Sequence, residues 1–538
     1  MKLFTFFLFF ILSIFTIQAQ TEDAWIYFTD KPNASYFYAH PLEMLSQRAL
    51  NRRQTQNIAL DIKDVPLYSD YVSQIQNSEG ITLIASSKWL NCLHIQGTQA
   101  AIASLGNLSF VASIEYANHS LNNKLYSVIH SKKQVNKFST FTDFNYGNAS
   151  NQIVMLHGNF LHQNNYTGSG IQIAVIDAGF TNVNTMSSFD RLRNNNQILG
   201  TYNFIERDND VYFRHYHGTM VLSTMAGYVE NQFVGTAPDA SYYLFITEDG
   251  NQEHPYEESL WVEAAEKADS LGVDVINTSL AYSLFDRTEY DHTYDDMNGQ
   301  TTFISRGAAI GFSRGMLLVN SAGNDGNSPW HYIAAPADTF NVLTIGAVDA
   351  SGNIASFSSW GPNASGLIKP DVCAQGAGSA IINTSNTIIN GNGTSFSSPI
   401  LAGAASCLWQ AFPNKTNAQI SQIIKESAHL YATPDFHYGY GIPNFEWAYN
   451  TLKLEETQSI NLTIFPNPIA SNEQLNILLS QIQPNTLLTI SEINGKVILK
   501  QKLDSVQNQI DIRNFSQGLY FISIQSEQSQ ITQKLMIY

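Results

Sequence analysis

Residues 391–399 read Gly-Asn-Gly-Thr-Ser-Phe-Ser-Ser-Pro, and residues 400–408 after them are small or apolar. This pattern predicts a glycine-rich turn that leads into a buried helix, with Ser395 at the helix start. A hydroxyl in that position lies above the positive end of the helix dipole, which suits a nucleophile. The alternative is a helix-capping serine, since serine is a preferred N-cap. The two interpretations differ in whether the chain also supplies a base, an orienting carboxylate and an oxyanion donor.

Three other segments carry these remaining groups. Asp177 follows the apolar run 173–176, which predicts a carboxylate at the end of a buried strand. His217 precedes small residues, which predict a helix start packed closely against a neighbour, with the imidazole directed into a cleft. Asn324 stands in a turn of small residues after the run 316–320, and its side-chain NH2 is a candidate donor to a developing oxyanion.

Each of these residues also has an ordinary structural interpretation. Strand-end aspartates often bind local amides, and asparagine is common in turns. For His215 and His217, one alternative is a metal site on one face of a strand. No third ligand has suitable spacing nearby, which argues against it. All the candidate residues fall at a strand end or a helix start, in the chain order Asp, His, Asn, Ser, so the four weak signals reinforce one another.

A second serine fits a different catalytic pattern. Residues 311–315 read Gly-Phe-Ser-Arg-Gly, which matches the nucleophile elbow of α/β-hydrolases. That elbow runs from a strand into a helix, whereas here a predicted helix comes first and the strand 316–320 follows. The order is reversed, so Ser313 is predicted to be a helix-end residue.

The segment from 151 to 454 resembles the subtilisin-like serine peptidases. The blocks that carry the resemblance are Val175-Ile176-Asp177-Ala178-Gly179, His217-Gly218-Thr219, Ala322-Gly323-Asn324, Ser356-Phe357-Ser358-Ser359-Trp360-Gly361, Lys369-Pro370-Asp371 and Gly393-Thr394-Ser395-Phe396-Ser397-Ser398-Pro399. The family more often has Thr or Ser in place of Ala178, and Met-Ala in place of Phe396 and Ser397. Neither departure touches the reacting groups.

The resemblance implies a role for each candidate. Ser395 would attack a peptide carbonyl, His217 would take its proton and return it to the leaving amine, and Asp177 would fix the imidazole tautomer. Asn324 and the backbone amide of Ser395 would receive the oxyanion.

The resemblance also implies where the substrate binds. Ser279, Leu280 and Ala281 correspond to the strand that pairs with extended substrate, and pairing through the main chain tolerates many sequences. Asp325 is expected at the rim of the first specificity pocket. A preference for basic residues in that pocket is a hypothesis.

The composition bounds the class of protein. A chain of 538 residues needs two or three cores of ordinary size. Its net charge of -17, with 14% charged residues, argues against nucleic acid or an anionic membrane as partner. Within 151–454 short β-branched runs alternate with helical stretches, which predicts an α/β domain whose parallel sheet is covered by helices. In such sheets ligands bind at the carboxyl ends of the strands.

The residues before this domain predict an export signal and a small domain. Residues 1–19 contain a lysine, an apolar run and a small residue near the end, as a secretory signal peptide does; a retained anchor is the alternative. Residues 20–120 predict an α+β unit with strands at 24–28, 81–95 and 111–116 and helices at 41–54, 65–75 and 98–105. By its position it would be an inhibitory propeptide, with a binding module as the alternative. The polar stretch 121–150 is predicted to be a cleavable linker.

The residues after the α/β domain predict a second fold. Residues 460–538 form short alternating runs with a hairpin signal at Asn494-Gly495-Lys496, so a small β-sandwich is expected. The stretches 464–468, 494–496 and 518–520, with the final strand, resemble the sorting domains of type IX secretion. The resemblance implies export through the periplasm and the outer membrane, the outer-membrane secretion machinery as a partner, and release or surface attachment.

No cofactor is expected for the chemistry. The three cysteines, Cys92, Cys373 and Cys407, are too few and too far apart for a disulfide framework or a zinc site, so buried free thiols are expected. Structural calcium remains possible at an unknown site. The run Asp208-Asn209-Asp210 is one candidate, with a solvated acidic loop as the alternative.

The sequence therefore predicts a secreted serine endopeptidase made as a zymogen. It would act on protein or peptide substrates through an Asp/His/Ser triad and an acyl-enzyme intermediate, and it would bind its own propeptide. One alternative is an inactive subtilisin-fold protein used for binding or adhesion. A third possibility is that the same triad hydrolyses esters or transfers acyl groups.

Overall fold

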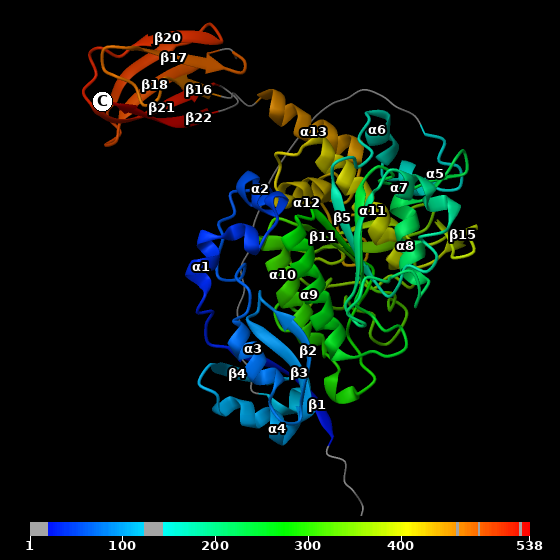
Figure 1. The fold of residues 1–538 in the computed structure, drawn as a ribbon. Coiled ribbons are helices and arrows are strands. Elements are labelled where there is room, and N and C mark those ends of the chain that lie inside the picture. Colours follow the sequence, from blue (N-terminus) through cyan, green and yellow to red (C-terminus); the bar gives the residue numbers. More distant parts are fainter. Residues whose placement is uncertain (1–19, 123–143, 459–461, 483–484, 527–529) are drawn as a thin grey trace, which may run out of the picture. The chain divides into compact units, whose positions relative to one another are not determined.

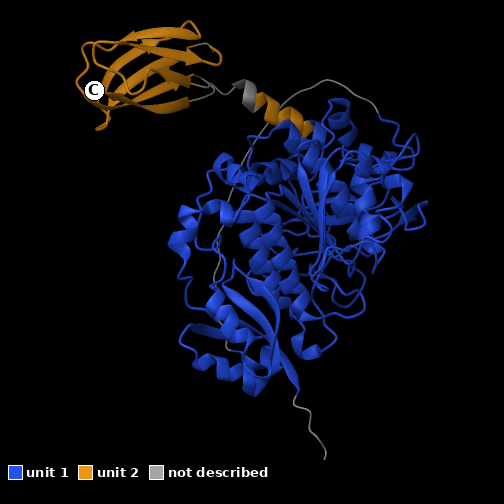
Figure 2. Ribbon diagram, in the orientation of Figure 1, with its two compact units in different colours: residues 1–134, 140–446 blue, residues 135–139, 447–538 orange. Residues whose placement is uncertain are grey.

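The computed structural model describes residues 20–122, 144–458, 462–482, 485–526 and 530–538. The predicted signal peptide, 1–19, and the part of the predicted linker from 123 to 143 lie outside these residues. The chain divides into two compact units, one reaching residue 446 and one starting at residue 447 (Figure 2). In the described ranges no helix is both long and apolar enough to cross a membrane.

A parallel sheet forms the centre of the first unit. Among the described residues it has seven strands in the order β13-β12-β11-β10-β5-β9-β6. Every pairing between neighbours is parallel. The strands are β5 (Gln172–Asp177), β6 (Ile198–Asn203), β9 (Ser241–Ile246), β10 (Val275–Thr278), β11 (Leu317–Ser321), β12 (Leu343–Val348) and β13 (Val372–Gln375). Nearly all residues of β10 to β13 are buried, as expected for a sheet covered on both faces.

Helices cover the two faces of this sheet (Figure 1). The main ones are α8 (His217–Ala226), α9 (Pro255–Leu271), α10 (Phe303–Ser313), α11 (Thr394–Ala411) and α12 (Asn417–Glu426). Ile276 of β10 packs in an apolar cluster with residues of α9 and α10. Its neighbour Asn277 points to the opposite face, where its Oδ1 accepts a hydrogen bond of 2.9 Å from Ser398 of α11. The predicted α/β class is confirmed.

The first unit contains an antiparallel sheet that precedes the α/β domain in the chain. In the described range 20–122 its strands are β1 (Thr21–Phe28), β2 (Ile81–Ser87), β3 (Cys92–Thr98) and β4 (Val111–Tyr116), in the order β2-β3-β1-β4. The helices with it are α1 (Ala34–Ala39), α2 (Gln47–Thr55), α3 (Ser69–Gln76) and α4 (Gln99–Ser104). This is the predicted small α+β unit.

Three details of that unit differ from the prediction. The helix predicted at 65–75 begins only at Ser69. The stretch 81–95 is a hairpin and not one strand, because the chain turns at Asn91, which has a φ of 55°. The helix predicted at 41–54 begins at Gln47, since Ser46 caps it by accepting a hydrogen bond of 3.2 Å from the Ala49 amide. A short 3-10 turn, Pro41–Glu43, precedes the cap.

The second unit begins within helix α13 (Phe445–Gln458) and is otherwise a β-structure with its own core. The strands β16 (Leu462–Phe465), β17 (Gln474–Leu479) and β20 (Gln507–Asp511) form one antiparallel sheet, and β18 (Leu487–Glu492), β19 (Val497–Lys502), β21 (Gly518–Gln525) and β22 (Gln530–Ile537) form another. Alternate residues of both sheets meet in one apolar cluster. The predicted sandwich is therefore present.

Candidate active site

Asp177 and His217 meet at the carboxyl end of β5. Asp177 is the last residue of that strand and is fully buried, and His217 is the first residue of α8. The Nδ1 atom of His217 lies 2.8 Å from Oδ1 and 3.1 Å from Oδ2 of Asp177. The approach requires Gly218, because a Cβ at that position would lie 2.5 Å from the Gly179 carbonyl oxygen. The glycine that follows the histidine in the sequence thus brings the helix against the strand end.

The Asp177 carboxylate also fixes the state of the imidazole. An ionised carboxylate accepts only, so Nδ1 carries the proton and Nε2 is left as the basic nitrogen. Burial lowers the pKa of His217, but the charge and hydrogen bond of Asp177 outweigh it, so the pKa is raised above its usual 6.5. His217 is thereby a stronger base than a free histidine.

Ser395 lies at the start of α11. Gly393, with a φ of 151°, is the N-cap of that helix, so Ser395 does not have the capping role considered above. The serine hydroxyl donates a long hydrogen bond of 3.5 Å to the Ser279 carbonyl oxygen. No hydrogen bond joins it to His217 among the residues that the structure describes. The neighbouring Phe396 ring lies 6.3 Å from the His217 ring between centroids, so the starts of α8 and α11 are close together.

Asn324 follows β11 and is oriented by a residue that the sequence analysis missed. Its Oδ1 atom accepts hydrogen bonds from the backbone amide of Thr394, at 2.9 Å, and from the Thr394 hydroxyl, at 3.1 Å. With Oδ1 held in this way, the NH2 group faces the other direction, and the residue is exposed. Thr394 directly precedes Ser395, and that adjacency was the available signal.

The predicted substrate-binding residues occupy different environments. Ser279 is buried under the nucleophile candidate and donates a hydrogen bond of 3.0 Å to the Ser395 carbonyl oxygen. Leu280 is half-buried and Ala281 is exposed. The Asp325 carboxylate accepts a hydrogen bond of 3.2 Å from the Ser328 hydroxyl.

Other candidates from the sequence lie outside this site. Ser313 is the last residue of α10, and its hydroxyl donates a hydrogen bond of 2.7 Å to the Ile310 carbonyl oxygen, which confirms the helix-end prediction. All three cysteines are buried free thiols, as predicted.

In the calcium candidate, one oxygen of each carboxylate accepts a hydrogen bond from the backbone. Asp208 and Asp210 are exposed, and each accepts a backbone amide, from Asp210 at 2.9 Å and from Tyr212 at 3.1 Å. Within the described ranges no group of three or more His, Cys, Asp and Glu side chains is arranged to hold a metal ion. His215 and His217 therefore have no third ligand of this kind there.

Comparisons with known proteins cover all three parts of the chain. Residues 168–441 match the model of the subtilase family, residues 23–136 match a peptidase S8 propeptide domain of Bacteroidota, and residues 463–538 match a secretion system C-terminal sorting domain. Subtilisin E of Bacillus subtilis (strain 168) is 31% identical over 54% of this chain and 68% of its own. Subtilisin DY of Bacillus licheniformis is 29% identical over 53% of this chain and 92% of its own. The crystal structure of MycP1 with its N-terminal propeptide removed aligns with a TM-score of 0.43 and 25% identity, over 55% of this chain and 96% of that one.

These matches define a secreted hydrolase with a propeptide. The chain belongs to the subtilase family, and it is a serine endopeptidase made as a zymogen. Its C-terminal domain is a type IX sorting domain, which directs secretion across the outer membrane to the cell surface or beyond. Subtilisins typically bind calcium, but their catalysis needs no cofactor.

Proposed function

We propose that this protein hydrolyses peptide bonds through a triad of Ser395, His217 and Asp177. The observation that carries the proposal is the pairing of His217 Nδ1 with a fully buried carboxylate at 2.8 Å. That pairing leaves Nε2 as a base of raised pKa beside the start of the helix that bears Ser395. A binding protein has no physical need for such an arrangement.

The reaction would follow two steps. Rotation about χ1 would move the Ser395 hydroxyl from the Ser279 carbonyl to Nε2 of His217, which takes the proton as Oγ attacks the substrate carbonyl. His217 then returns the proton to the leaving amine, and an ester bond joins the acyl group to Ser395. Water, deprotonated by His217, cleaves this ester in the second step. Asp177 stabilises the imidazolium throughout.

The oxyanion of each tetrahedral intermediate would be bound by Asn324 Nδ2 and the Ser395 amide. The substitution Asn324→Leu should lower kcat by about a hundred- to a thousand-fold with little change in KM, because the donor acts only in the transition state. Steady-state kinetics on a peptide amide would measure both constants. Asn327→Leu, at an exposed position in the same loop, is the matched control and should leave kcat unchanged. An equal fall in both variants would remove Asn324 from this role.

The substrate would be an extended peptide segment. It would pair with the main chain at Ser279, Leu280 and Ala281, while Asp325 would lie at the rim of the first specificity pocket.

We also propose the limits of the parts: a signal peptide at 1–19, a propeptide at 20–120, a cleaved linker at 121–150, a peptidase domain at 151–454 and a sorting domain at 460–538. The secretion machinery of the outer membrane would remove the last.

The direct test is covalent labelling of the processed protein. A fluorophosphonate should add to Ser395 and to no other serine, with mass spectrometry locating the adduct, and a denatured protein substrate should be degraded before labelling but not after it. Ester and amide substrates, with and without an added amine, would show whether hydrolysis or acyl transfer dominates. Processed protein that neither cleaves nor becomes labelled would refute the assignment.

A further inference from the structure

Helix α2 of the N-terminal domain carries three arginines that reach into the peptidase domain. We call Arg48, Arg52 and Arg53 the arginine clasp. Arg52 and Arg53 are buried, with exposed side-chain fractions of 4% and 3%. Burial of two adjacent guanidinium groups is costly unless their donors are satisfied, so the partners decide whether the clasp is favourable.

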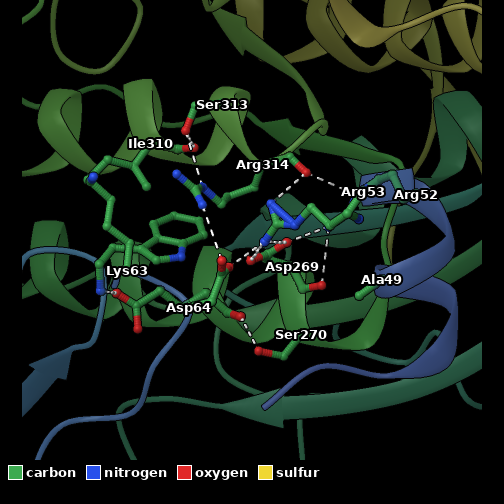
Figure 3. A network of polar contacts seen from close by, with 12 residues as sticks. Ala49, Arg52, Arg53, Lys63, Asp64, Asp269, Ser270, Ile310, Ser313 and Arg314 are labelled. Carbon is green, nitrogen blue, oxygen red and sulfur yellow. Dashed lines mark hydrogen bonds and ion pairs between the residues drawn. The ribbon is translucent and has the colours of Figure 1, made fainter. Parts of the chain in front are cut away.

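The principal partner is Asp269 near the end of α9. Its side chain is fully buried and forms ion pairs with both Arg52 and Arg53, the latter at 2.8 Å from Oδ2 (Figure 3). Arg48, whose side chain is 39% exposed, forms an ion pair with Asp274, which precedes β10. Each of these arginines contacts its carboxylate through Nη2 alone. The other nitrogens of Arg52 and Arg53 remain available as donors to further acceptors, which a single ammonium group could not reach at the same time.

Backbone carbonyls complete the site. Arg52 donates from Nε to the Arg314 carbonyl at 3.2 Å and from Nη1 to the Val273 carbonyl, and Arg53 Nη1 donates to the Arg314 carbonyl at 3.0 Å. Arg314 is the C-cap of α10, and Val273 follows Gly272, the C-cap of α9. Arg52 Nη2 also donates a hydrogen bond of 3.3 Å to the Asp269 carbonyl, in the last turn of α9, so carbonyl groups at the ends of both helices face the clasp with their partial negative charge.

The contact is reciprocal. Arg314 of the peptidase domain donates to Asp61 at 2.8 Å and to Asp64 at 3.4 Å, and both acidic residues belong to the N-terminal domain. Asp64 also accepts from Arg53 at 2.7 Å, which links the two halves of the network (Figure 3). Positive charges from each domain are thus matched by carboxylates of the other.

The network lies at the opposite edge of the sheet from the catalytic groups. Asp274 precedes β10 and Gly315 precedes β11, so the clasp contacts the amino ends of these strands. Asp177 ends β5 and Asn324 follows β11, at the carboxyl ends. Because the sheet is parallel, the two regions are separated by the length of the strands.

The close approach of α2 depends on the glycines that follow α9 and α10. A Cβ on Gly272 would lie 2.8 Å from the Ala49 amide nitrogen, and one on Gly315 would lie 3.0 Å from the Gln56 side chain. Gln56 itself donates a hydrogen bond of 2.8 Å to the Gly315 carbonyl oxygen. The peptidase surface is therefore shaped, as well as charged, to receive this helix.

We propose that the peptidase domain carries a guanidinium-binding exosite, formed by Asp269, Asp274 and the carbonyl groups at the ends of α9 and α10, and that α2 of the propeptide is its occupant. The exosite holds the propeptide on the enzyme after the connecting chain is cut, independently of any contact in the catalytic cleft. The inference rests on the propeptide leaving the mature enzyme, but not on the assignment of the triad.

The test uses the full chain with Ser395→Ala, which separates binding from catalysis. The recognition sequence of a foreign protease is inserted between residues 123 and 143, the chain is cut there, and the Kd of the resulting complex is measured by dilution and size-exclusion chromatography. Replacing both Arg52 and Arg53 by Ala should weaken the complex by at least about 30-fold, because each truncation leaves buried polar groups unpaired. Replacing both by Lys should also weaken it, since one ammonium group cannot reach the carboxylate and the backbone carbonyls together.

Matched variants separate this effect from a general change in the helix. Asn51→Ala and Gln54→Ala each change an exposed residue of α2, and both should bind like the parent. Asp269→Asn tests the exosite from the peptidase side if the arginine variants do not fold. A double alanine variant within threefold of the parent Kd would overturn the exosite, and a double lysine variant that binds like the parent would overturn its selectivity for guanidinium.

Discussion

The substitution Ser395→Ala should reduce kcat for peptide hydrolysis by about a million-fold, the size of effect known for loss of the nucleophile in subtilisin itself. Alanine removes the Oγ atom that attacks the carbonyl and leaves the helix start unchanged, because Gly393 and not Ser395 is the N-cap. The measurement is the turnover of a peptide amide by processed protein, with the parent assayed at matched concentration. The rate that remains should be the one that substrate binding and oxyanion stabilisation support without a nucleophile.

Two other serines provide controls for that loss. Ser406 lies in the same helix, and its buried hydroxyl donates a hydrogen bond of 2.8 Å to the Ala402 carbonyl oxygen. Ser406→Ala therefore removes a comparable hydroxyl without changing the site. Ser313→Ala removes the serine of the rejected elbow pattern. Both variants should keep turnover within a fewfold of the parent. Activity of Ser395→Ala within tenfold of the parent would show that another group is the nucleophile.

The parts of the site that sequence could predict are those encoded locally. The run 173–176 is apolar throughout, so its end at Asp177 was visible without a fold. Small residues after His217 marked the start of α8 at the residue where the structure has it. Local patterns do not show that the end of this strand and the start of this helix lie close together in space. The resemblance to subtilases predicts that they do.

The clasp shows what local patterns cannot encode. Arginines at two adjacent positions of a helix are expected on a solvated face, yet Arg52 and Arg53 are buried. Their burial is explained by Asp269 and by carbonyl groups more than 200 residues away in the chain, for instance at a separation of 217. The same reason applies to Thr394 and Asn324, whose hydrogen bonds join loops that are 70 residues apart.

The strand prediction for residues 81–95 failed because the residue types at the turn do not require a turn. The stretch 81–95 alternates as one strand would, but Asn91 adopts a left-handed φ and turns the chain back on itself. Asparagine tolerates that region better than most residues, so the residue type was compatible with a turn without requiring one. The side chain of Trp89, next to this turn, packs in the cluster with α9 and α10.

The substitution Asp177→Asn should lower kcat by about ten-thousand-fold, because an amide at that position no longer holds the imidazole in the tautomer that leaves Nε2 basic. It should also move the pH dependence. His217 acts as a base only when neutral, and its raised pKa places the acid limb of kcat/KM above the usual 6.5 in the parent. Without the carboxylate, burial alone acts on the imidazole and lowers its pKa, so the acid limb of the residual activity should lie at lower pH than in the parent.

The measurement is kcat/KM of both proteins across the range from acid to mildly alkaline pH, with a burst titration to count active sites. Asp210→Asn changes an exposed carboxylate in the same way and should leave both the rate and the acid limb unchanged. A loss of rate in Asp177→Asn without a shift of the acid limb would mean that the carboxylate positions His217 but does not set its pKa. An unchanged rate would remove Asp177 from the triad, because no other carboxylate hydrogen-bonds His217 among the described residues.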